Sequence, residues 1–225
     1  MSANGVRALI LMDTQALVLD TTTGARISTL LNIGNDPDTT RFNTDATTIL
    51  TFTNTYDAAT GTTSLQHWAT DILTGQQNTL GSVVTFTGAV TEKALSVDGS
   101  SAIYVTSVLD PASPNRVVRV VRVDTLLNQI VTTTNVILPT GGLDLVSSAD
   151  TDRVALVSYD YGEPMSTKLV AIDTTTGTQI GSTIGLIPGP INYPVMSADG
   201  KLMLLYTYGP VNYSGKTLQS IFRLA

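Results

Sequence analysis

The sequence predicts an all-β protein built from repeated four-stranded units, and three observations lead to this prediction. Thr, a β-branched residue typical of strands, occurs 37 times in 225 residues. No window keeps the 3.6-residue apolar period of a long helix. Two different turn motifs recur along the chain, both with a spacing of about fifty residues. This repetition decides the architecture, because a fixed period of that length indicates stacked supersecondary units.

The first turn motif is Asp-Thr-Thr-Thr-Gly. It stands at residues 20–24 and 173–177, with looser copies at 71–75 and 124–128. In each copy, Gly or Asn follows the aspartate by four residues. Aspartate bonds to its own backbone in turns, and Gly or Asn adopts a positive φ. We therefore expect a tight turn between strands at each of the four places.

The second turn motif is Ser-Ala-Asp-Gly at residues 197–200. Related segments occupy residues 43–46, 96–99 and 148–151, and Ser-Ala-Asn-Gly fits the same position at residues 2–5. Asp-Gly between two strand-like runs is a strong signal for a hairpin. The motif therefore predicts a second set of tight turns.

The spacing of the two motifs predicts the fold. Aspartates of the first motif are 51, 53 and 49 residues apart, and those of the second are 53, 52 and 49 apart. Each unit reads as four antiparallel strands, a to d, which is typical of a β-propeller blade. We therefore predict one propeller domain over residues 1–225, with units at about 1–35, 36–89, 90–141, 142–189 and 190–225.

The first unit begins at its a–b turn and lacks strand a, while the last unit lacks strand d. The favoured architecture is a five-bladed ring with incomplete first and last blades, and the alternative is a segment of a longer array. Unpaired strand edges invite pairing. We expect either a composite blade formed by the two termini or self-association through the end strands.

Two segments resemble a known kind of repeat: Ser-Ala-Asp-Gly-Lys-Leu-Met-Leu-Leu at 197–205 and Leu-Val-Ala-Ile-Asp-Thr-Thr-Thr-Gly-Thr-Gln-Ile-Gly at 169–181. They look like the YVTN-type repeats of bacterial β-propellers, and like the Thr-rich propeller repeats of exported actinobacterial proteins. The resemblance covers nearly the whole chain, but its motifs are turn motifs. It implies a propeller fold and is almost silent on function.

Composition limits the location and the chemistry. The net charge of −6 argues against a nucleic-acid-binding surface, and the absence of cysteine excludes disulfides and thiol nucleophiles. No segment approaches the roughly 20 apolar residues of a membrane helix, and residues 1–5 do not form a signal peptide. The Thr-rich, Lys-poor, Cys-free composition favours an extracytoplasmic or secreted bacterial protein, with no membrane insertion.

Neither a metal nor a cofactor is expected. His67 is the only histidine, and its position relative to the turn is apolar in the sister units, so we interpret it as a core residue. Each turn offers a single carboxylate, whereas a calcium loop supplies several closely spaced ones. The turn aspartates are therefore interpreted as turn formers.

The b–c connections are the candidate binding site. They are longer and more varied than the other turns, rich in tyrosine and acidic residues, and expected to share one face of a propeller. Function concentrates on loops of this kind, and exposed tyrosines give contact area at low entropic cost. The sequence thus predicts a non-catalytic interaction or scaffold domain with a cationic or polar partner, a protein or a glycan. The candidate residues are Tyr56, Asp57, Asp110, Tyr159, Asp160, Tyr161, Glu163, Tyr208 and Tyr213.

An enzymatic alternative rests on the inner strands. Asp38, Glu92 and Asp144 precede their turn aspartates by six or seven residues, so they could converge at the mouth of an axial channel. Five-bladed propeller glycosidases use inner-strand carboxylates as acid and base. The alternative function is therefore a carbohydrate-active propeller.

Overall fold

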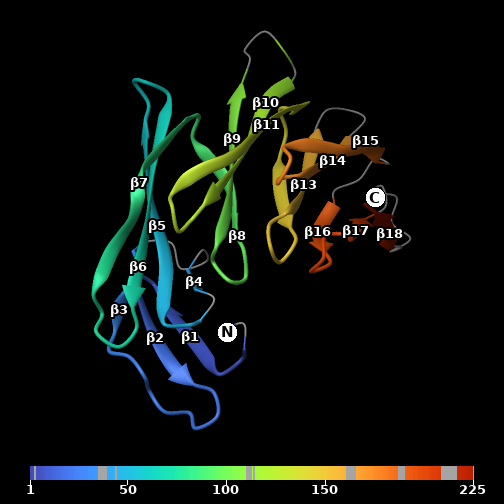
Figure 1. Cartoon of the computed structure of the whole chain (residues 1–225). Coiled ribbons are helices and arrows are strands. Elements are labelled where there is room, and N and C mark those ends of the chain that lie inside the picture. The colour runs from blue at the N-terminus through green and yellow to red at the C-terminus, as the bar shows by residue number, and fades with distance from the viewer. Residues whose placement is uncertain are drawn as a thin grey trace. The chain divides into compact units, whose positions relative to one another are not determined.

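The computed structural model describes residues 1–2, 4–34, 40–43, 45–109, 113, 115–160, 166–186, 191–208 and 217–224. At residues 109, 160, 166, 186, 191–193, 206–208 and 217–220 it describes the backbone alone. Within these ranges the regular structure consists entirely of β-strands, as Figure 1 shows. No helix in the described residues is long and apolar enough to cross a membrane.

Within each sheet, strands that follow one another along the chain are hydrogen-bonded neighbours. They are β1 (Arg7–Met12), β2 (Gln15–Asp20), β3 (Leu31–Asn32), β4 (Arg41–Phe42), β5 (Thr48–Asp57), β6 (Thr62–Asp71), β7 (Gln77–Thr87), β8 (Val90–Leu95), β9 (Ser101–Leu109), β10 (Asn115–Asp124), β11 (Gln129–Pro139), β12 (Leu143–Ser147), β13 (Arg153–Asp160), β14 (Ser166–Asp173), β15 (Thr178–Leu186), β16 (Ile191–Met196), β17 (Leu202–Tyr208) and β18 (Thr217–Arg223).

The described strands form five sheets, which confirms the predicted blades. The second, third and fourth blades have four strands each, β4–β7, β8–β11 and β12–β15. The first blade, β1–β3, begins with strand b, and the last blade, β16–β18, ends with strand c. Both incomplete blades thus lack the strand that the turn motifs predict to be missing. The chain is a β-propeller.

Backbone contacts divide the chain into two compact units, and each unit contains part of the third blade. One comprises Met1–Ala89, Leu95–Ile103 and Val123–Val131, and the other comprises Val90–Ala94, Tyr104–Arg122 and Thr132–Ala225. The first unit has an apolar core between its first and second blades, around Val18, Phe42 and Ile49. The second has a core between the fourth and fifth blades, around Leu169 and Met203. That the whole chain is one domain stays a prediction.

The c–d turns have the predicted construction. Oδ1 of Asp20, Asp71, Asp124 and Asp173 accepts hydrogen bonds from the backbone N–H groups two and three residues later, at 2.7–3.0 Å. The fifth residue of each turn has a positive φ, 71° at Gly24 and 50° at Asn128. Aspartate therefore closes each turn, and Gly or Asn ends it.

The a–b turns repeat a second construction. Ser96, Ser148 and Ser197 donate a hydroxyl hydrogen bond to the aspartate two residues later, at 2.6–2.7 Å. Ser2 donates in the same way to the amide oxygen of Asn4, at 2.8 Å. The N-terminal segment therefore forms the predicted a–b turn of the first blade.

His67 is buried, as its position in the repeat predicts. Its Nδ1 lies 2.5 Å from Oδ1 of Asn128, and the amide of Asn128 donates to the carbonyl oxygen of Ser82 at 2.5 Å. The c–d turn of the third blade is thus anchored in the second blade. Burial lowers the pKa of His67, although the hydrogen bond that its Nδ1–H donates to Oδ1 of Asn128 opposes the shift.

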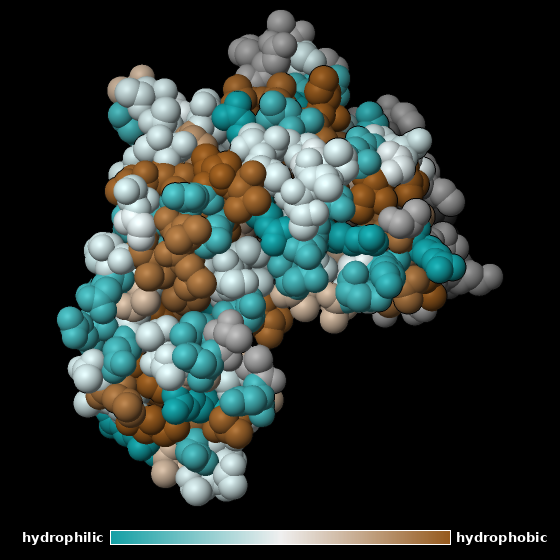
Figure 2. Space-filling view, in the orientation of Figure 1, coloured by the Kyte–Doolittle hydropathy of each residue, from teal (hydrophilic) through white to brown (hydrophobic). Residues whose placement is uncertain are grey.

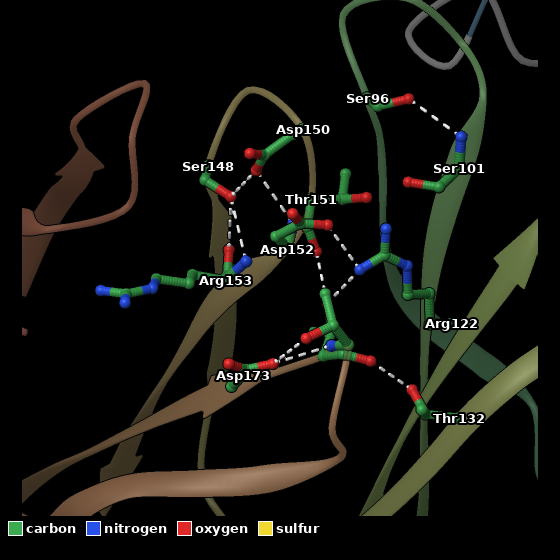
Figure 3. Close-up of polar contacts among 12 residues, drawn as sticks. Ser96, Ser101, Arg122, Thr132, Ser148, Asp150, Thr151, Asp152, Arg153 and Asp173 are labelled. Atoms are coloured by element: carbon green, nitrogen blue, oxygen red, sulfur yellow. Dashed lines mark hydrogen bonds and ion pairs between the residues drawn. The ribbon is translucent and has the colours of Figure 1, made fainter.

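A second anchor joins the third and fourth blades within the other unit. Nη1 of Arg122 lies 2.6 Å from Oδ1 of Asp152 and donates to the hydroxyl of Thr174 at 3.2 Å (Figure 3). Thr132 donates a further hydrogen bond, at 2.5 Å, to the carbonyl oxygen of Thr174. Both anchors are made by the a–b or c–d turns, so these turns stabilise the packing of one blade on the next.

Candidate functional site

Each blade has two ends with different side chains. We call the end with the a–b and c–d turns the turn end, and the end with the b–c and d–a connections the loop end. At the turn end, hydrogen bonds hold the carboxylates in their own turns. The backbone N–H groups of Thr23 and Thr74 lower the pKa values of Asp20 and Asp71. These groups are structural.

The described b–c connections are shorter than the sequence predicts for a binding loop. In the first blade, Met12 pairs with Gln15, so two residues form the connection. In the second blade, Oδ1 of Asp57 accepts the N–H of Ala59 at 2.8 Å, and Gly61 N–H bonds to the carbonyl oxygen of Asp57 at 2.8 Å.

This connection is a tight turn of the same kind as the c–d turns, and the expectation of a long, varied loop is wrong here. The sequence contains the signal, because Gly61 follows Asp57 by four residues, as Gly75 follows Asp71. The Ala59 N–H lowers the pKa of Asp57, which acts as a turn former. Tyr56 beside it is 45% exposed, in agreement with the expected exposure.

Tyr159 lies in the core, and its predicted place on an exposed loop is wrong. Its side chain is 8% exposed and packs in the apolar cluster of the fourth and fifth blades. Strand β13 runs through it, because Tyr159 pairs with Thr167 and the next residue pairs with Ser166. The Tyr159 hydroxyl donates a hydrogen bond to Oδ2 of Asp144.

The structure brings two of the three inner-strand carboxylates together. Glu92 lies near the start of β8 and Asp144 near the start of β12, so both stand at the loop end, and both are half-buried. Burial, and then the negative charge of Asp144, raise the pKa of Glu92. Among the described residues, Glu92 has no cationic partner. Glu92, Asp144 and Tyr159 form what we call the loop-end acidic cluster.

The remaining candidates lie outside what the structure describes. Asp38, Asp110, Tyr161, Glu163 and Tyr213 fall outside the described residues, and Asp160 and Tyr208 are described by their backbone alone. Their proposed roles stay predictions. No group of three or more metal-ligating side chains is found in the described part of the chain.

Two cavities are lined by other residues of the described chain. One is lined by turn-end residues, among them Asp45 and Asp98. The other, of about 310 Å³, lies between β1 and β4 and is lined by Leu9, Leu11 and Phe42. Neither cavity includes Glu92 or Asp144.

Comparison with known proteins supports the fold. The chain is similar to the β-propeller domain of the trilobed protease from Pyrococcus furiosus, which is described as having an open velcro topology (TM-score 0.51, 13% identity, 93% of this chain and 59% of that one). It is also similar to the Cps50 (Swd1) β-propeller domain of Myceliophteria thermophila (TM-score 0.51, 12% identity, 99% of this chain and 69% of that one). Both likenesses concern the propeller fold alone, because the identities are low.

A third similar structure is a complex of KlAtg21 with the coiled coil of AgAtg16 (TM-score 0.58, 11% identity, 100% of this chain and 69% of that one). The chain spans less than two thirds of the Pyrococcus domain. No protein-family model and no curated protein matches the sequence.

Proposed function

We propose that this propeller is a non-catalytic interaction domain that binds a cationic or polar partner, a protein or a glycan, at the loop end of its blades. One observation supports the proposal most. Turn-end carboxylates are held by hydrogen bonds in their own turns, whereas Glu92 is half-buried near Asp144, and burial and the negative charge of Asp144 raise its pKa. A cationic group placed at this pair would counteract this shift.

The Tyr159 hydroxyl orients Asp144 within the cluster, since it donates to one carboxylate oxygen. The other oxygen and the carboxylate of Glu92 can then accept from an incoming ammonium or guanidinium group. Propellers of similar fold include a β-propeller domain that belongs to a protease and a protein in complex with a coiled coil, so the fold by itself does not select the partner. We further propose that the repeats are of the YVTN type and that the protein acts outside the cytoplasm of a bacterium.

The test is binding of the purified chain to an array of short peptides graded in net charge, with a glycan array in parallel. We expect cationic peptides to be retained, and the double variant Glu92→Gln/Asp144→Asn to bind them at least about tenfold more weakly. The matched control is Asp20→Asn/Asp71→Asn, which removes the same charge at the turn end while the amide oxygen still accepts the turn hydrogen bonds. Equal losses in both variants would contradict the proposal.

A second function is favoured by the unequal surroundings of the two carboxyls. A group with a raised pKa beside a second carboxyl is the arrangement that acid catalysis in glycoside hydrolysis needs. In this reading Glu92 is the proton donor, and Asp144, with Asp38, is its partner. Hydrolysis of aryl glycosides that the Glu92→Gln variant abolishes would favour it, and retention without hydrolysis of any glycan on the array would count against it.

A further inference from the structure

The second blade has a sheet face that the first blade covers only near the turn end, around Ile49. In the first blade, β1 and β2 have six residues each, and Met12 pairs with Gln15 beside their connection. In the second blade, β5 and β6 have ten residues each, and four further pairs follow the equivalent pair Thr53–Gln66. The hairpin of the second blade therefore extends beyond that of the first, because the internal strands differ in length.

The two faces of this extended hairpin differ in burial. On one face Thr63 and Leu65 of β6 are buried, together with Val84 and Phe86 of β7. We call the opposite face the open face, and its exposed or half-buried residues are Thr53, Thr55, Ser64, Gln66, Trp68, Thr79, Val83 and Thr85. Figure 2 shows mainly residues of intermediate hydropathy at the upper left, where Figure 1 places the hairpin of β5 and β6.

Trp68 is the only tryptophan of the chain, and it lies at a position that other blades bury. The residue three places before the c–d turn aspartate is Val121 in the third blade and Val170 in the fourth, 0% and 1% exposed. Trp68 is half-buried, and its indole Nε1 donates a hydrogen bond to Oγ1 of Thr53 at 3.3 Å. Since Thr53 belongs to the neighbouring strand, the indole extends over β5 along the sheet.

A row of hydroxyl groups crosses the open face. Ser64 pairs with Thr55 of β5 and with Thr85 of β7, so the three side chains lie on adjacent strands about 5 Å apart. None of these hydroxyls has a hydrogen-bond partner among the described residues. Gln66 uses its amide N–H groups on two backbone carbonyl oxygens, at 2.8 and 2.9 Å, so its Oε1 remains an acceptor. The carboxylate of Asp57, at the tip, is held in its own turn.

We propose that the open face binds a neutral glycan chain. The C–H faces of sugar rings pack on an aromatic ring, and sugar hydroxyls pair with side chains that donate and accept hydrogen bonds. A half-buried indole beside a row of unpaired hydroxyls supplies both kinds of contact. Because the open face has no charged side chain, it favours an uncharged sugar over a cationic peptide or an acidic polysaccharide. The inference does not rest on the loop-end acidic cluster.

The single tryptophan makes binding at this face observable. Cellohexaose, xylohexaose and maltohexaose are titrated into the purified chain while the fluorescence of Trp68 is recorded. We expect at least one of these neutral sugars to shift the emission saturably and to protect Trp68 from quenching by acrylamide. An acidic counterpart, hexagalacturonate, should bind at least about tenfold more weakly. The absence of a saturable change with all three neutral sugars would overturn the proposal.

A hydroxyl-deletion variant tests the row while Trp68 stays as the reporter. Thr55→Val/Thr85→Val removes two hydroxyls with little change in side-chain shape, and it should bind the tightest neutral sugar at least about tenfold more weakly. The matched control is Thr133→Val, the same change at an exposed threonine of β11, which should bind within about threefold of the parent. Valine suits a strand, and melting curves establish that both variants are folded. Equal affinities of the two variants would contradict the proposal.

Calorimetry with the same sugar separates this face from the loop end. Glu92→Gln/Asp144→Asn should bind the sugar like the parent. If that variant lost the sugar and the sugar left Trp68 emission unchanged, the glycan would bind at the loop-end acidic cluster. The present inference would then be wrong, while the proposed function would stand. Concentration-dependent self-association that protects Trp68 without sugar would also overturn the inference, because the open face would then belong to a second copy of the chain.

Discussion

The two ends of the blades use similar residues for different purposes. At the turn end, Asp173 accepts hydrogen bonds from the backbone N–H groups of Thr175 and Thr176 at 2.9 and 3.0 Å, and its carboxylate is part of the fold. At the loop end, Asp144 is held by a tyrosine hydroxyl and lies near Glu92, whose pKa is raised by burial and then by the charge of Asp144. The difference teaches that a recurring acidic residue indicates a binding site only where its carboxylate does not accept hydrogen bonds from the backbone of its own turn.

The largest effect is expected at Gly81, where the turn end of the third blade packs on β7. A Cβ there would lie 1.9 Å from the carbonyl oxygen of Leu127, and the residue has a φ of +58°. Gly81→Ala should lower the free energy of unfolding by about 3–5 kcal/mol, from backbone strain and overpacking together.

Gly24→Ala is the matched control. Gly24 has a φ of +71° but nothing within 4 Å of its added Cβ, so strain alone should cost about 1–2 kcal/mol. Denaturant melts measure both values. Equal losses would show that the turn of the third blade is not packed as described.

Removal of a turn carboxylate should have an intermediate effect. Asp173→Ala deletes the acceptor of two backbone N–H groups and should lower the melting temperature by about 2–4 °C. Asp173→Asn keeps an acceptor oxygen and should lose less. If Asp173→Ala had the same melting temperature as the parent, this carboxylate would be dispensable for the fold. The proposed difference between the two ends of the blades would then be wrong.

His67 should make stability depend on pH near neutrality. Because burial lowers its pKa in the folded state, the unfolded chain binds the proton first as the pH falls below the ordinary value of 6.5. Stability should therefore be complete above pH 6.5 and decrease as the pH falls from 7 to 5.5. In the His67→Phe variant this slope should disappear, although the variant is less stable at pH 7 because Oδ1 of Asn128 loses its hydrogen-bond donor. Urea melts at three pH values give the comparison.

Glu92→Gln should have the smallest effect on stability, and it should raise the melting temperature where the other variants lower it. The pKa of Glu92 is raised on folding, so its ionised form is a cost that appears as the pH rises above the ordinary value of 4.5. The variant should melt slightly above the parent at pH 7 and together with it at pH 4. A lower melting temperature at pH 7 would show that the Glu92 carboxylate is a structural group like Asp173.

The sequence predicted the turn end well because its signals are local. Each turn depends on one aspartate and one residue with a positive φ, such as Asp71 and Gly75, only four positions apart. Glu92 and Asp144 occupy the same position of the repeat in successive blades, and this also indicated that their side chains would lie close together. Such positions repeat with the blade period.

The loop end was predicted less well because its geometry depends on long-range pairing. Tyr159 lies in a Tyr-Asp-Tyr-Gly segment that is typical of a loop, yet pairing with β14 extends the strand through it and buries the ring. Its hydrogen bond to Asp144 leaves no pattern in the sequence. The turn at Asp57 was missed for another reason, since the Asp-to-Gly spacing was present but was not applied to a b–c connection.

The most direct test of the contrast between the two ends is hydrogen–deuterium exchange with and without the tightest cationic peptide from the array. The account predicts added protection in residues 90–94, 142–147 and 157–160, which carry the loop-end acidic cluster. It predicts unchanged exchange in the turns at 20–24, 71–75 and 173–177. Protection confined to those turns, with no change around Glu92 and Asp144, would contradict it.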